Sequence, residues 1–237
     1  MQEVSNIIQK RQSARIPFDS ERPVAKEDLR QILEAARWAP TAHNMQNFEI
    51  IVVDDKKILN AIGSIKSTIS ETFIRENYEQ LSFSEEELLN KKVGILGTMF
   101  PPAWRTPGYK PNKETDSRRP VQTSPVMLIV VYDPHRRAPA SEGDFLGIVS
   151  LGCVMENMWL MANSLGISFH VVSAIGTDAV EKEVKRILNI PDHLKIPFAF
   201  RLGYPVSPPA KYLRVRREIE DFTYHNRFGN RYNPSCF

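Results

Sequence analysis

Two arginines and a serine alternate near the start of the chain, in the run Arg11-Gln12-Ser13-Ala14-Arg15. Side chains at every second position of an extended segment point the same way, so these three polar groups would converge on one ligand. A guanidinium group can donate two parallel hydrogen bonds to a phosphate, and a nearby hydroxyl can complete such a site. The spacing therefore predicts an oxyanion site, whereas the simpler interpretation of a short basic run is a solvated face.

A second polar block follows one helix later and runs from Pro40 to Phe48, with the sequence Pro-Thr-Ala-His-Asn-Met-Gln-Asn-Phe. Together the two blocks resemble the FMN-dependent nitroreductase superfamily. Its members open with Arg-x-Ser-x-Arg/Lys and continue with Pro-Ser-x-x-Asn-x-Gln-Pro-Trp. This chain has Thr41, Asn47 and Phe48 where that motif has Ser, Pro and Trp, which are changes of modest size and polarity.

The resemblance implies an FMN site with cations at both ends of the cofactor. Arg11 and Ser13 map to the phosphate, and Arg15 maps to the N1–O2 edge of the ring, where a fixed positive charge favours the reduced, anionic ring. The pair in Arg214-Val215-Arg216 maps to the residues that complete the phosphate site in many members, with Arg217 as the alternative for either position.

Polar and small residues are implied around the flavin ring. Asn44 and Gln46 carry both donors and acceptors, which suits the uracil-like edge of the ring, although a hydrogen-bonded turn uses the same residue types. The segment 173–176 maps to the loop that approaches flavin N5 with backbone N–H groups, and taken alone it is equally typical of a strand-to-helix loop. The full set of implied cofactor-binding residues is Arg11, Gln12, Ser13, Arg15, Pro40, Thr41, Ala42, Asn44, Gln46, Ser173, Ala174, Ile175, Gly176, Arg214 and Arg216.

The resemblance also implies an oxidoreductase in which no side chain is a catalytic group. Hydride passes from the cosubstrate NAD(P)H to flavin N5 and then, in a ping-pong exchange, to a nitroaromatic, quinone or similar electrophile, while the protein contributes positioning and electrostatics. Two alternatives stay open: a reductive dehalogenase or flavin reductase of the same superfamily, and a flavin-binding protein that delivers FMN without turnover. The implied partners are a second copy of the chain, in a homodimer, and a small-molecule electron acceptor.

Apolar periodicity predicts the elements that would position the first two blocks. Helical spacing covers residues 3–10 and 26–38, on either side of the first block, and Pro40 ends the second of these helices. The β-branched run 48–53 predicts a strand buried in a sheet. Residues 56–96 show a mostly helical pattern.

The most apolar helix is predicted from Asp144 to Leu165, because its apolar residues cover too much of its circumference for a surface helix. In the superfamily such a helix lies in the homodimer interface, whereas the residues alone equally allow a helix buried within one subunit. Around it we predict strands at 126–132, 167–173 and 198–204 and a helix at 180–188. The resemblance then implies an α+β fold with a central, mostly antiparallel sheet flanked by helices.

Two segments stand apart from these elements. Residues 98–124 are rich in proline, aromatic residues and cations, which predicts an active-site loop or lid rather than a solvated linker. Residues 208–237 are polar and aromatic, and we expect them to extend across the partner subunit. Both segments are assigned to a single nitroreductase-like FMN-binding domain over residues 1–237, since the length suits one α/β unit. The candidate lid residues are Phe100, Trp104, Arg105 and Tyr109.

Composition and charge narrow the class of protein. The chain has 42% hydrophobic and 25% charged residues, as in soluble globular proteins. Its net charge of +3 comes from 31 basic and 28 acidic residues that are interleaved, so no cationic surface for nucleic acid is implied. The start lacks a signal-peptide pattern and the longest apolar run, 127–132, is too short to span a bilayer, so we expect no membrane association and a cytoplasmic location. The two cysteines and five histidines show no spacing for a disulfide framework or a metal site.

Overall fold

The computed structural model describes residues 2–66, 86, 90, 119–208 and 216–232, which fall into two compact units. The described part of the first unit is residues 2–66 and 119–208, and it contains the sheet. The described part of the second is residues 86, 90 and 216–232, which include a short 3-10 helix at Ile219–Asp221 and a β-bridge between Tyr224 and Arg231. The assignment of both to a single domain stays a prediction.

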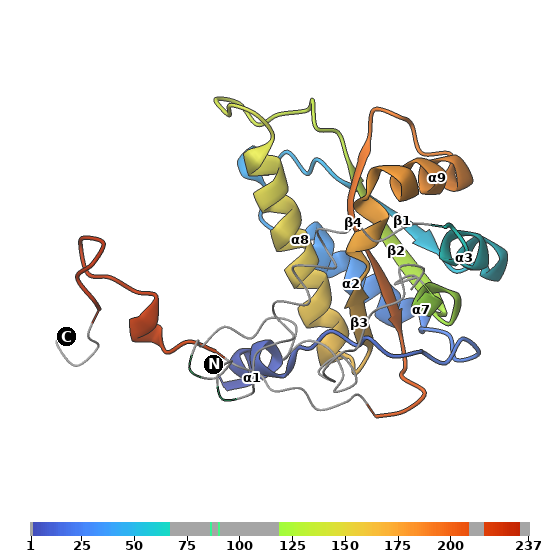
Figure 1. Cartoon of the computed structure of the whole chain (residues 1–237), viewed down its shortest axis with the longest axis horizontal. Coiled ribbons are helices and arrows are strands. Elements are labelled where there is room, and N and C mark those ends of the chain that lie inside the picture. The colour runs from blue at the N-terminus through green and yellow to red at the C-terminus, as the bar shows by residue number, and fades with distance from the viewer. Residues whose placement is uncertain (1, 67–85, 87–89, 91–118, 209–215, 233–237) are drawn as a thin grey trace. The chain divides into compact units, whose positions relative to one another are not determined.

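The first unit is built on a four-stranded sheet (Figure 1). Its strands are β1 (Glu49–Val53), β2 (Val126–Tyr132), β3 (Ser168–Val171) and β4 (Lys195–Gly203), in the order β1-β2-β4-β3. Every neighbouring pair is antiparallel. The prediction of an α+β fold around an antiparallel sheet is therefore confirmed.

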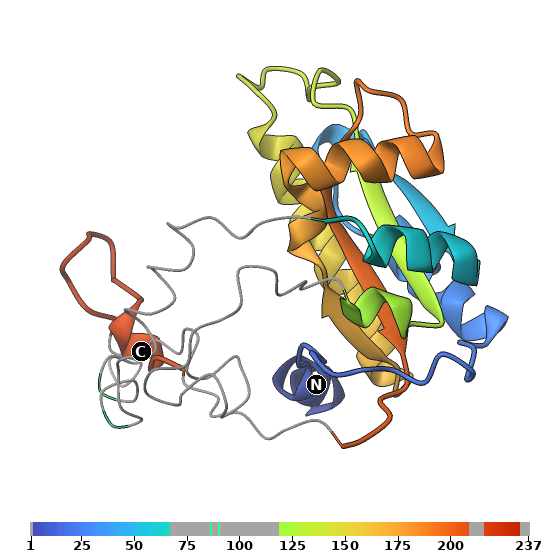
Figure 2. The ribbon, with the colours of Figure 1, turned by 45° about the vertical axis from the view of Figure 1, so that its right-hand side comes forward.

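Helices cover both faces of this sheet, so that the unit has three layers (Figure 2). On one face lie α2 (Lys26–Arg37) and α8 (Phe145–Ser164). On the other lie α3 (Lys56–Gly63), α7 (Arg119–Gln122) and α9 (Asp178–Leu188). The sequence places each helix directly before or after a strand, which is how the chain buries both sides of a sheet.

The central strand β2 divides the core between the two layers of helices. All seven of its residues are buried, and successive side chains point to opposite faces of the sheet. Leu128 and Val130 join the cluster with α2 and α8, whereas Met127 and Ile129 join the cluster with α3 and α9. A continuous apolar run is what a strand covered on both faces requires.

The remaining helix of this unit, α1 (Gln2–Lys10), delivers the chain to the first polar block. It packs beside α8, where Asn163 Nδ2 donates a hydrogen bond of 3.3 Å to the backbone carbonyl of Ile7. The amphipathic spacing of its sequence predicted this helix within one residue.

Three predicted strands differ from the observed ones. The strand predicted at 167–173 is shorter, because β3 ends at Val171 and Ser173 begins a 3-10 helix. The strand at 48–53 is not buried in the sheet: β1 is an edge strand, with Glu49 and Val52 exposed, so that prediction is wrong. The last strand begins at Lys195, three residues before the predicted start, and includes Pro197. Proline is tolerated there because β3 pairs only with residues 200–203 and the β2 pairing shifts register nearby, so no partner needs the missing N–H.

The predicted lid at 98–124 contains one described helix, α7, at its end. The prediction of a loop is therefore wrong for residues 119–122. The candidate lid residues Phe100, Trp104, Arg105 and Tyr109 lie outside the described residues, and the lid stays a prediction.

Helix α8 is apolar around most of its circumference but is buried along one stripe only. Leu151, Val154 and Met158 are buried, whereas the side chains of Phe145 and Val149 are 68% and 48% exposed. Among the described residues, α8 is the one helix whose length and composition alone would suffice to cross a membrane, a property that core helices of soluble proteins share.

Candidate functional site

The first polar block belongs to a segment, residues 11–19, that runs along the β3 edge of the sheet and that we call the strap. The backbone N–H of Arg11 still bonds to the carbonyl of Ile7, so Arg11 stands at the end of α1 and the extended chain begins after it. Ser13 then pairs with Phe169 of β3 in a parallel bridge, and Ala14 N–H donates 3.0 Å to the Phe169 carbonyl. The predicted alternation of side chains therefore applies from Ser13 onward and does not include Arg11.

Arg11 is held against α8 by two side chains that the sequence did not single out. Its Nε lies 3.0 Å from Glu156 Oε1, and its Cζ lies 4.3 Å from the centre of the Trp159 ring. Trp159 Nε1 also donates a hydrogen bond of 3.3 Å to the carbonyl of Gln12. A guanidinium group carries five N–H donors in a planar fork, so Arg11 can bind an anion while it keeps Glu156 as a partner.

Two basic residues, the fully buried Arg201 and the partly buried His170, lie beneath the strap. Arg201 of β4 is fully buried and donates from Nε to Nδ1 of His170 at 2.8 Å. Burial, followed by the charges of Arg201 and Arg15, lowers the pKa of His170 to about 3. The imidazole is therefore neutral in the physiological range. An arginine inside the apolar run 198–202 was the available sequence signal, and it was missed.

The second polar block forms a tight loop, residues 41–46, that we call the Thr41 loop. His43, Asn44 and Gln46 all have positive φ, at 50°, 52° and 47°. Such conformations are costly for non-glycine residues and persist where the surroundings fix them, often at functional sites. Here Gln46 N–H donates to Thr41 Oγ1 at 3.1 Å, and Gln46 Nε2 donates to Asn44 Oδ1 at 3.1 Å. The hydrogen-bonded turn is thus formed, with the side chains of Asn44 and Gln46 exposed.

The strap and the Thr41 loop contact opposite faces of α8. Ala42 N–H donates a hydrogen bond of 3.0 Å to Ser150 Oγ, whereas Arg11 lies over Trp159. Ser150 and Trp159 are about two and a half helical turns apart, which places them on opposite sides of the helix. One chain therefore does not bring Asn44 and Gln46 to the strap.

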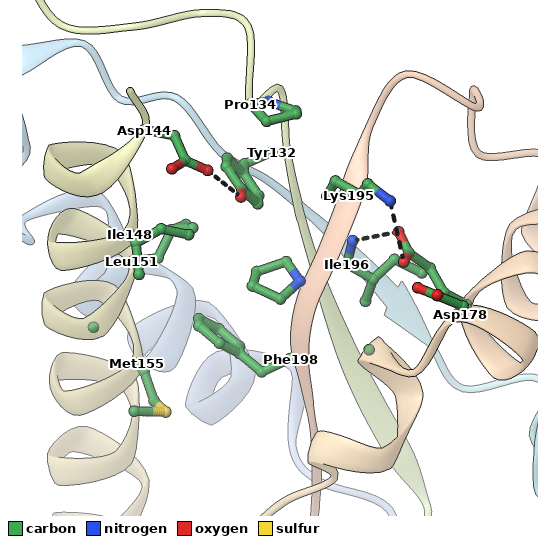
Figure 3. Close-up of a pocket in the computed structure, with 14 residues that line it drawn as sticks. Tyr132, Pro134, Asp144, Ile148, Leu151, Met155, Asp178, Lys195, Ile196 and Phe198 are labelled. Carbon is green, nitrogen blue, oxygen red and sulfur yellow. Dashed lines mark hydrogen bonds and ion pairs between the residues drawn. The ribbon is translucent and has the colours of Figure 1, made fainter. Parts of the chain in front are cut away.

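A cavity of about 670 Å³ opens between α8, the end of β2, the start of β4 and the segment that leads into α9 (Figure 3). One wall is apolar and the opposite end is polar. Figure 3 shows the hydrogen bond from Tyr132 to Asp144, which is 2.9 Å long. Lys195 Nζ lies 3.8 Å from Glu181 Oε2. The apolar lining includes Ile148, Leu151, Met155 and Phe198, and Gly176 also borders the cavity.

Two features shape this cavity. A Cβ on Gly176 would lie 3.0 Å from the carbonyl oxygen of Ile196, so a larger residue there would have to shift the chain. Burial, helped by the hydrogen bond to Asp144, raises the pKa of Tyr132 to about 12. Tyr132 therefore remains a protonated hydrogen-bond donor at the polar end.

The cavity and Arg11 share one face of α8. Ile148, Gly152 and Met155 line the cavity, and Trp159 lies under Arg11. These four positions follow the spacing i, i+4, i+7, i+11, which forms a single stripe along a helix. An anion held by the strap would thus lie along the same stripe as a group in the cavity.

The predicted residues of the loop after β3 divide between surface and core. The 3-10 helix Ser173–Gly176 begins two residues after β3, the strand to which the strap is bound. Ser173 and Gly176 are exposed, Ala174 is half-buried, and Ile175 is fully buried in the core. Ile175 can therefore contribute its backbone to a ligand but not its side chain.

The predicted basic residues of the tail are only partly described. Arg214 lies outside the described residues. Arg216 and Arg217 belong to the second unit and are exposed, and Arg217 Cζ lies 5.3 Å from the centre of the Phe222 ring. Phosphate binding by Arg214 and Arg216, with Arg217 as the alternative, stays a prediction.

Comparison with known proteins identifies the family. The sequence profile described as Nitroreductase family matches residues 8–204. The chain belongs to the nitroreductase family. This nitroreductase-family chain is 26% identical over 217 residues to the iodotyrosine deiodinase of Thermotoga neapolitana, covering 90% of this chain and 95% of the relative. It is 22% identical over 225 residues to an NADPH-dependent oxidoreductase of Staphylococcus aureus, covering 95% and 74%.

Solved structures agree with this family at the level of the fold. An FMN-dependent nitroreductase from Clostridium difficile superposes with a TM-score of 0.61 at 18% identity, covering 94% of this chain and 98% of that one. A nitroreductase with bound FMN from Bacteroides fragilis superposes with a TM-score of 0.57 at 21% identity, covering 91% and 95%. The nitroreductase-like fold predicted from the sequence is thus confirmed.

No group of three or more His, Cys, Asp or Glu side chains in the described part of this nitroreductase-family chain lies close enough together to hold a metal ion. Cys153 is a free, half-buried cysteine on α8.

Proposed function

We propose that this protein is an FMN-dependent NAD(P)H oxidoreductase that reduces nitroaromatic, quinone or similar electrophilic small molecules. The observation that carries the proposal is the continuity along α8 between a strap bearing Arg11, Ser13 and Arg15 and a cavity bordered by Gly176. The proposal is supported by the similarity to an NADPH-dependent oxidoreductase, to an iodotyrosine deiodinase and to the structure of a nitroreductase with bound FMN.

The residues present suit FMN at both ends. Arg11 and Ser13 offer a guanidinium and a hydroxyl to a phosphate dianion. The cavity volume of about 670 Å³ lies within the range of small-molecule and cofactor sites, and its apolar wall suits a planar ring. The bound cofactor would supply the hydride-accepting and hydride-donating centre.

The side chains of the protein would act by binding and electrostatics. Arg15 would place a positive charge at the N1–O2 edge of the ring, where it favours negative charge on the reduced ring. Ile148, Met155 and Phe198 would exclude water from the apolar wall, which strengthens electrostatic interactions within the cavity. The backbone of residues 173–176 would face N5. No side chain is required to transfer a proton, since solvent can supply it.

We further propose that the protein is a homodimer whose sites combine residues of both subunits. The Thr41 loop lies on the face of α8 opposite the strap, so Asn44 and Gln46 would reach the cofactor of a second copy. The exposed apolar residues Phe145 and Val149 supply a surface that such a copy would cover. A second copy accounts for this face better than a membrane, because α8 also carries the Arg11–Glu156 ion pair at mid-length. Extension of residues 208–237 across the partner, and a cytoplasmic location, remain part of this proposal.

Steady-state kinetics with added FMN tests the function. NADH and NADPH oxidation would be followed with menadione or nitrofurazone as the acceptor. Turnover with parallel double-reciprocal lines is expected, because a ping-pong exchange uses one pocket in turn for donor and acceptor. Tight FMN binding without turnover by either donor would instead favour the carrier that delivers FMN.

Reductive dehalogenation is the second candidate. It is favoured by the similarity to the Thermotoga iodotyrosine deiodinase over 95% of that protein's length. Release of iodide from 3-iodotyrosine by the FMN-loaded, chemically reduced protein would support it. Rapid reoxidation by quinones together with no iodide release would favour the leading proposal.

A further inference from the structure

Arg201 is a buried arginine in the middle of β4 whose side chain reaches the strap. Its Nη2 donates to the backbone carbonyl oxygens of Ala14, at 2.8 Å, and Ile16, at 2.7 Å. Its Nε donates to Nδ1 of His170 at 2.8 Å. The Phe18 ring covers the guanidinium, with its centre 4.1 Å from Cζ. A single side chain of the sheet thus binds two carbonyl groups of the strap.

These contacts lie on both sides of Arg15 in the chain. Ala14 comes directly before Arg15 and Ile16 directly after it, and Ala14 N–H is also bonded to the Phe169 carbonyl at 3.0 Å. The Ala14 carbonyl belongs to the peptide group just before Arg15, and the Ile16 carbonyl belongs to the second peptide group after it. Anchoring the chain at these two points restricts the position and direction of the Cα–Cβ bond of Arg15. The direction of that bond decides where the Arg15 charge can reach.

The protonation states support a permanent arrangement. Nδ1 of His170 accepts a hydrogen bond, so it carries no proton, and burial together with the charges of Arg201 and Arg15 keeps the imidazole neutral. Burial lowers the pKa of Arg201 to about 9, which still leaves the guanidinium charged at neutral pH. Hydrogen bonds from a charged donor are about twice as strong as neutral ones.

We propose that Arg201, with neutral His170 as its acceptor, is a positioning residue for the flavin: it fixes the strap on both sides of Arg15 and so holds the Arg15 charge at the ring edge. The inference rests on the proposed function. A buried ionic group is often no more stabilising than apolar residues of the same volume. The presence of Arg201 beneath the strap therefore indicates a role in holding the strap backbone in place, because an apolar side chain could not bind its carbonyl groups.

The first test measures the strap without the cofactor. Amide hydrogen exchange of Ala14 would be followed in FMN-free wild type, Arg201→Lys and Arg201→Met, with the exposed Arg186→Lys on α9 as the matched control. Lysine keeps the charge but has a single nitrogen, so it cannot bind the two carbonyls and His170 from separate nitrogens as Nη2 and Nε of Arg201 do. We expect Ala14 exchange to accelerate at least about tenfold in both Arg201 variants while the amides of β2 are unchanged, because a charge-assisted hydrogen bond is lost from a folded sheet.

The second test measures the cofactor in the same proteins. The dissociation constant of FMN should rise at least about tenfold in Arg201→Lys. The two-electron potential of the bound flavin should also fall, as in Arg15→Ala. A tenfold change in the ratio of the affinities for reduced and oxidised FMN corresponds to about 30 mV. Potentials would be measured at saturating FMN on variants whose folding is confirmed by circular dichroism. A merely structural role for Arg201 would leave that potential at the wild-type value.

A milder pair of variants keeps the inference testable if the Arg201 variants do not fold. His170→Leu removes the acceptor, whereas His170→Asn supplies an amide oxygen in its place. We expect His170→Leu to show faster Ala14 exchange and a lowered potential, and His170→Asn to restore both toward wild type.

Three results would decide against the inference or separate it from the proposed function. Unchanged Ala14 exchange in every variant would overturn it, because Arg201 would then not hold the strap. Faster exchange with unchanged FMN affinity and potential would also overturn it, since Arg201 would be structural only. Wild type that binds no FMN but shows Arg201-dependent exchange would refute the proposed function and the flavin role, and leave the strap contact alone standing.

Discussion

The backbone N–H of Ala42 donates a hydrogen bond of 3.0 Å to Ser150 Oγ, on the face of α8 that is turned away from Trp159 and Arg11. The same hydroxyl donates to the Leu146 carbonyl at 2.7 Å, so it connects the Thr41 loop to the helix backbone. One helix therefore presents one half of the proposed site on each of its sides. Two copies packed through this helix would bring the halves of opposite subunits together.

Removing this hydroxyl should loosen the Thr41 loop. Ser150→Ala leaves the Ala42 N–H without its partner, and we expect the free energy of unfolding to fall by about 1 kcal/mol, with weaker FMN binding. Chemical denaturation and FMN titration would measure both. Ser164→Ala is the control, because the Ser164 hydroxyl bonds to Met161 of the same helix. This variant should change FMN binding little. Equal effects of the two variants would remove Ser150 from the site.

Mixing two inactive subunits tests whether sites are shared. If each site uses Arg11 of one subunit and Asn44 of the other, a heterodimer of Arg11→Ala and Asn44→Ala contains one intact site. Random reassortment should then restore about a quarter of the wild-type FMN sites, because half of the dimers are mixed and each has one intact site of two. Absence of any recovery, with mixed dimers demonstrated by mass spectrometry, would place both residues of each site in one subunit.

The exposed face of α8 should govern the oligomeric state. Val149→Glu would bury an unpaired carboxylate in a dimer interface, which is costly, and we expect a monomer by light scattering at micromolar concentration. An obligate homodimer of this kind should bury more than about 2,000 Å². Val52→Glu, the same change at an exposed position of β1, should remain dimeric. A wild-type protein that is monomeric with FMN bound would contradict the shared site.

His170 should make folding stability depend on pH. Its folded pKa of about 3 lies below the ordinary value of 6.5, so between these values the unfolded chain binds a proton that the folded chain does not. The contribution is fully present above pH 6.5 and is lost as the pH falls toward 3, at a rate of up to about 1.4 kcal/mol per pH unit. Denaturation across this range should show a shallower slope in His170→Asn than in wild type, because the carboxyl groups that also titrate there are present in both proteins.

Local pattern was sufficient to predict the elements that carry strong periodicity. The strand β2 was recognised because burial on both faces of a sheet requires a continuous apolar run. The helix α8 was recognised from apolar residues around most of its circumference, although only one stripe of it is buried. The strap was recognised from residue types at fixed spacing. The position of Arg11 within it was not, since the backbone N–H of Arg11 still bonds to the Ile7 carbonyl of α1 and the extended chain begins only after Arg11.

The contacts that fix these elements depend on residues distant in the chain, and for that reason no local pattern contained them. Arg201 binds the carbonyl of Ala14, 187 positions away, and Ser150 binds Ala42, 108 positions away. The exposure of β1 likewise depends on which strand ends the sheet, and a β-branched run is compatible with an edge or a central strand. An isolated arginine in an apolar strand is the one local sign that could have drawn attention to Arg201.

The two arginines of the strap should have separable effects. Arg15→Ala removes charge from the reduced ring more than from the neutral oxidised ring, so the flavin potential should fall by some tens of millivolts, given about 1.5–3 kcal/mol for a hydrogen bond to a charged group. Arg11→Ala should weaken FMN retention with little change in potential, because the phosphate charge is the same in both redox states. Redox titration of both variants measures this, and equal potentials in wild type and Arg15→Ala would remove Arg15 from the ring edge.

The visible spectrum of the purified protein is the most direct measurement of whether this chain is a flavoprotein. We predict a yellow protein, or a colourless one that gains a bound-flavin spectrum on stoichiometric addition of FMN, because the strap and the cavity lie along one face of α8. Arg11→Ala should require a higher FMN concentration for the same spectrum. A folded wild-type protein that acquires no bound-flavin absorbance at any FMN concentration would contradict the proposed function.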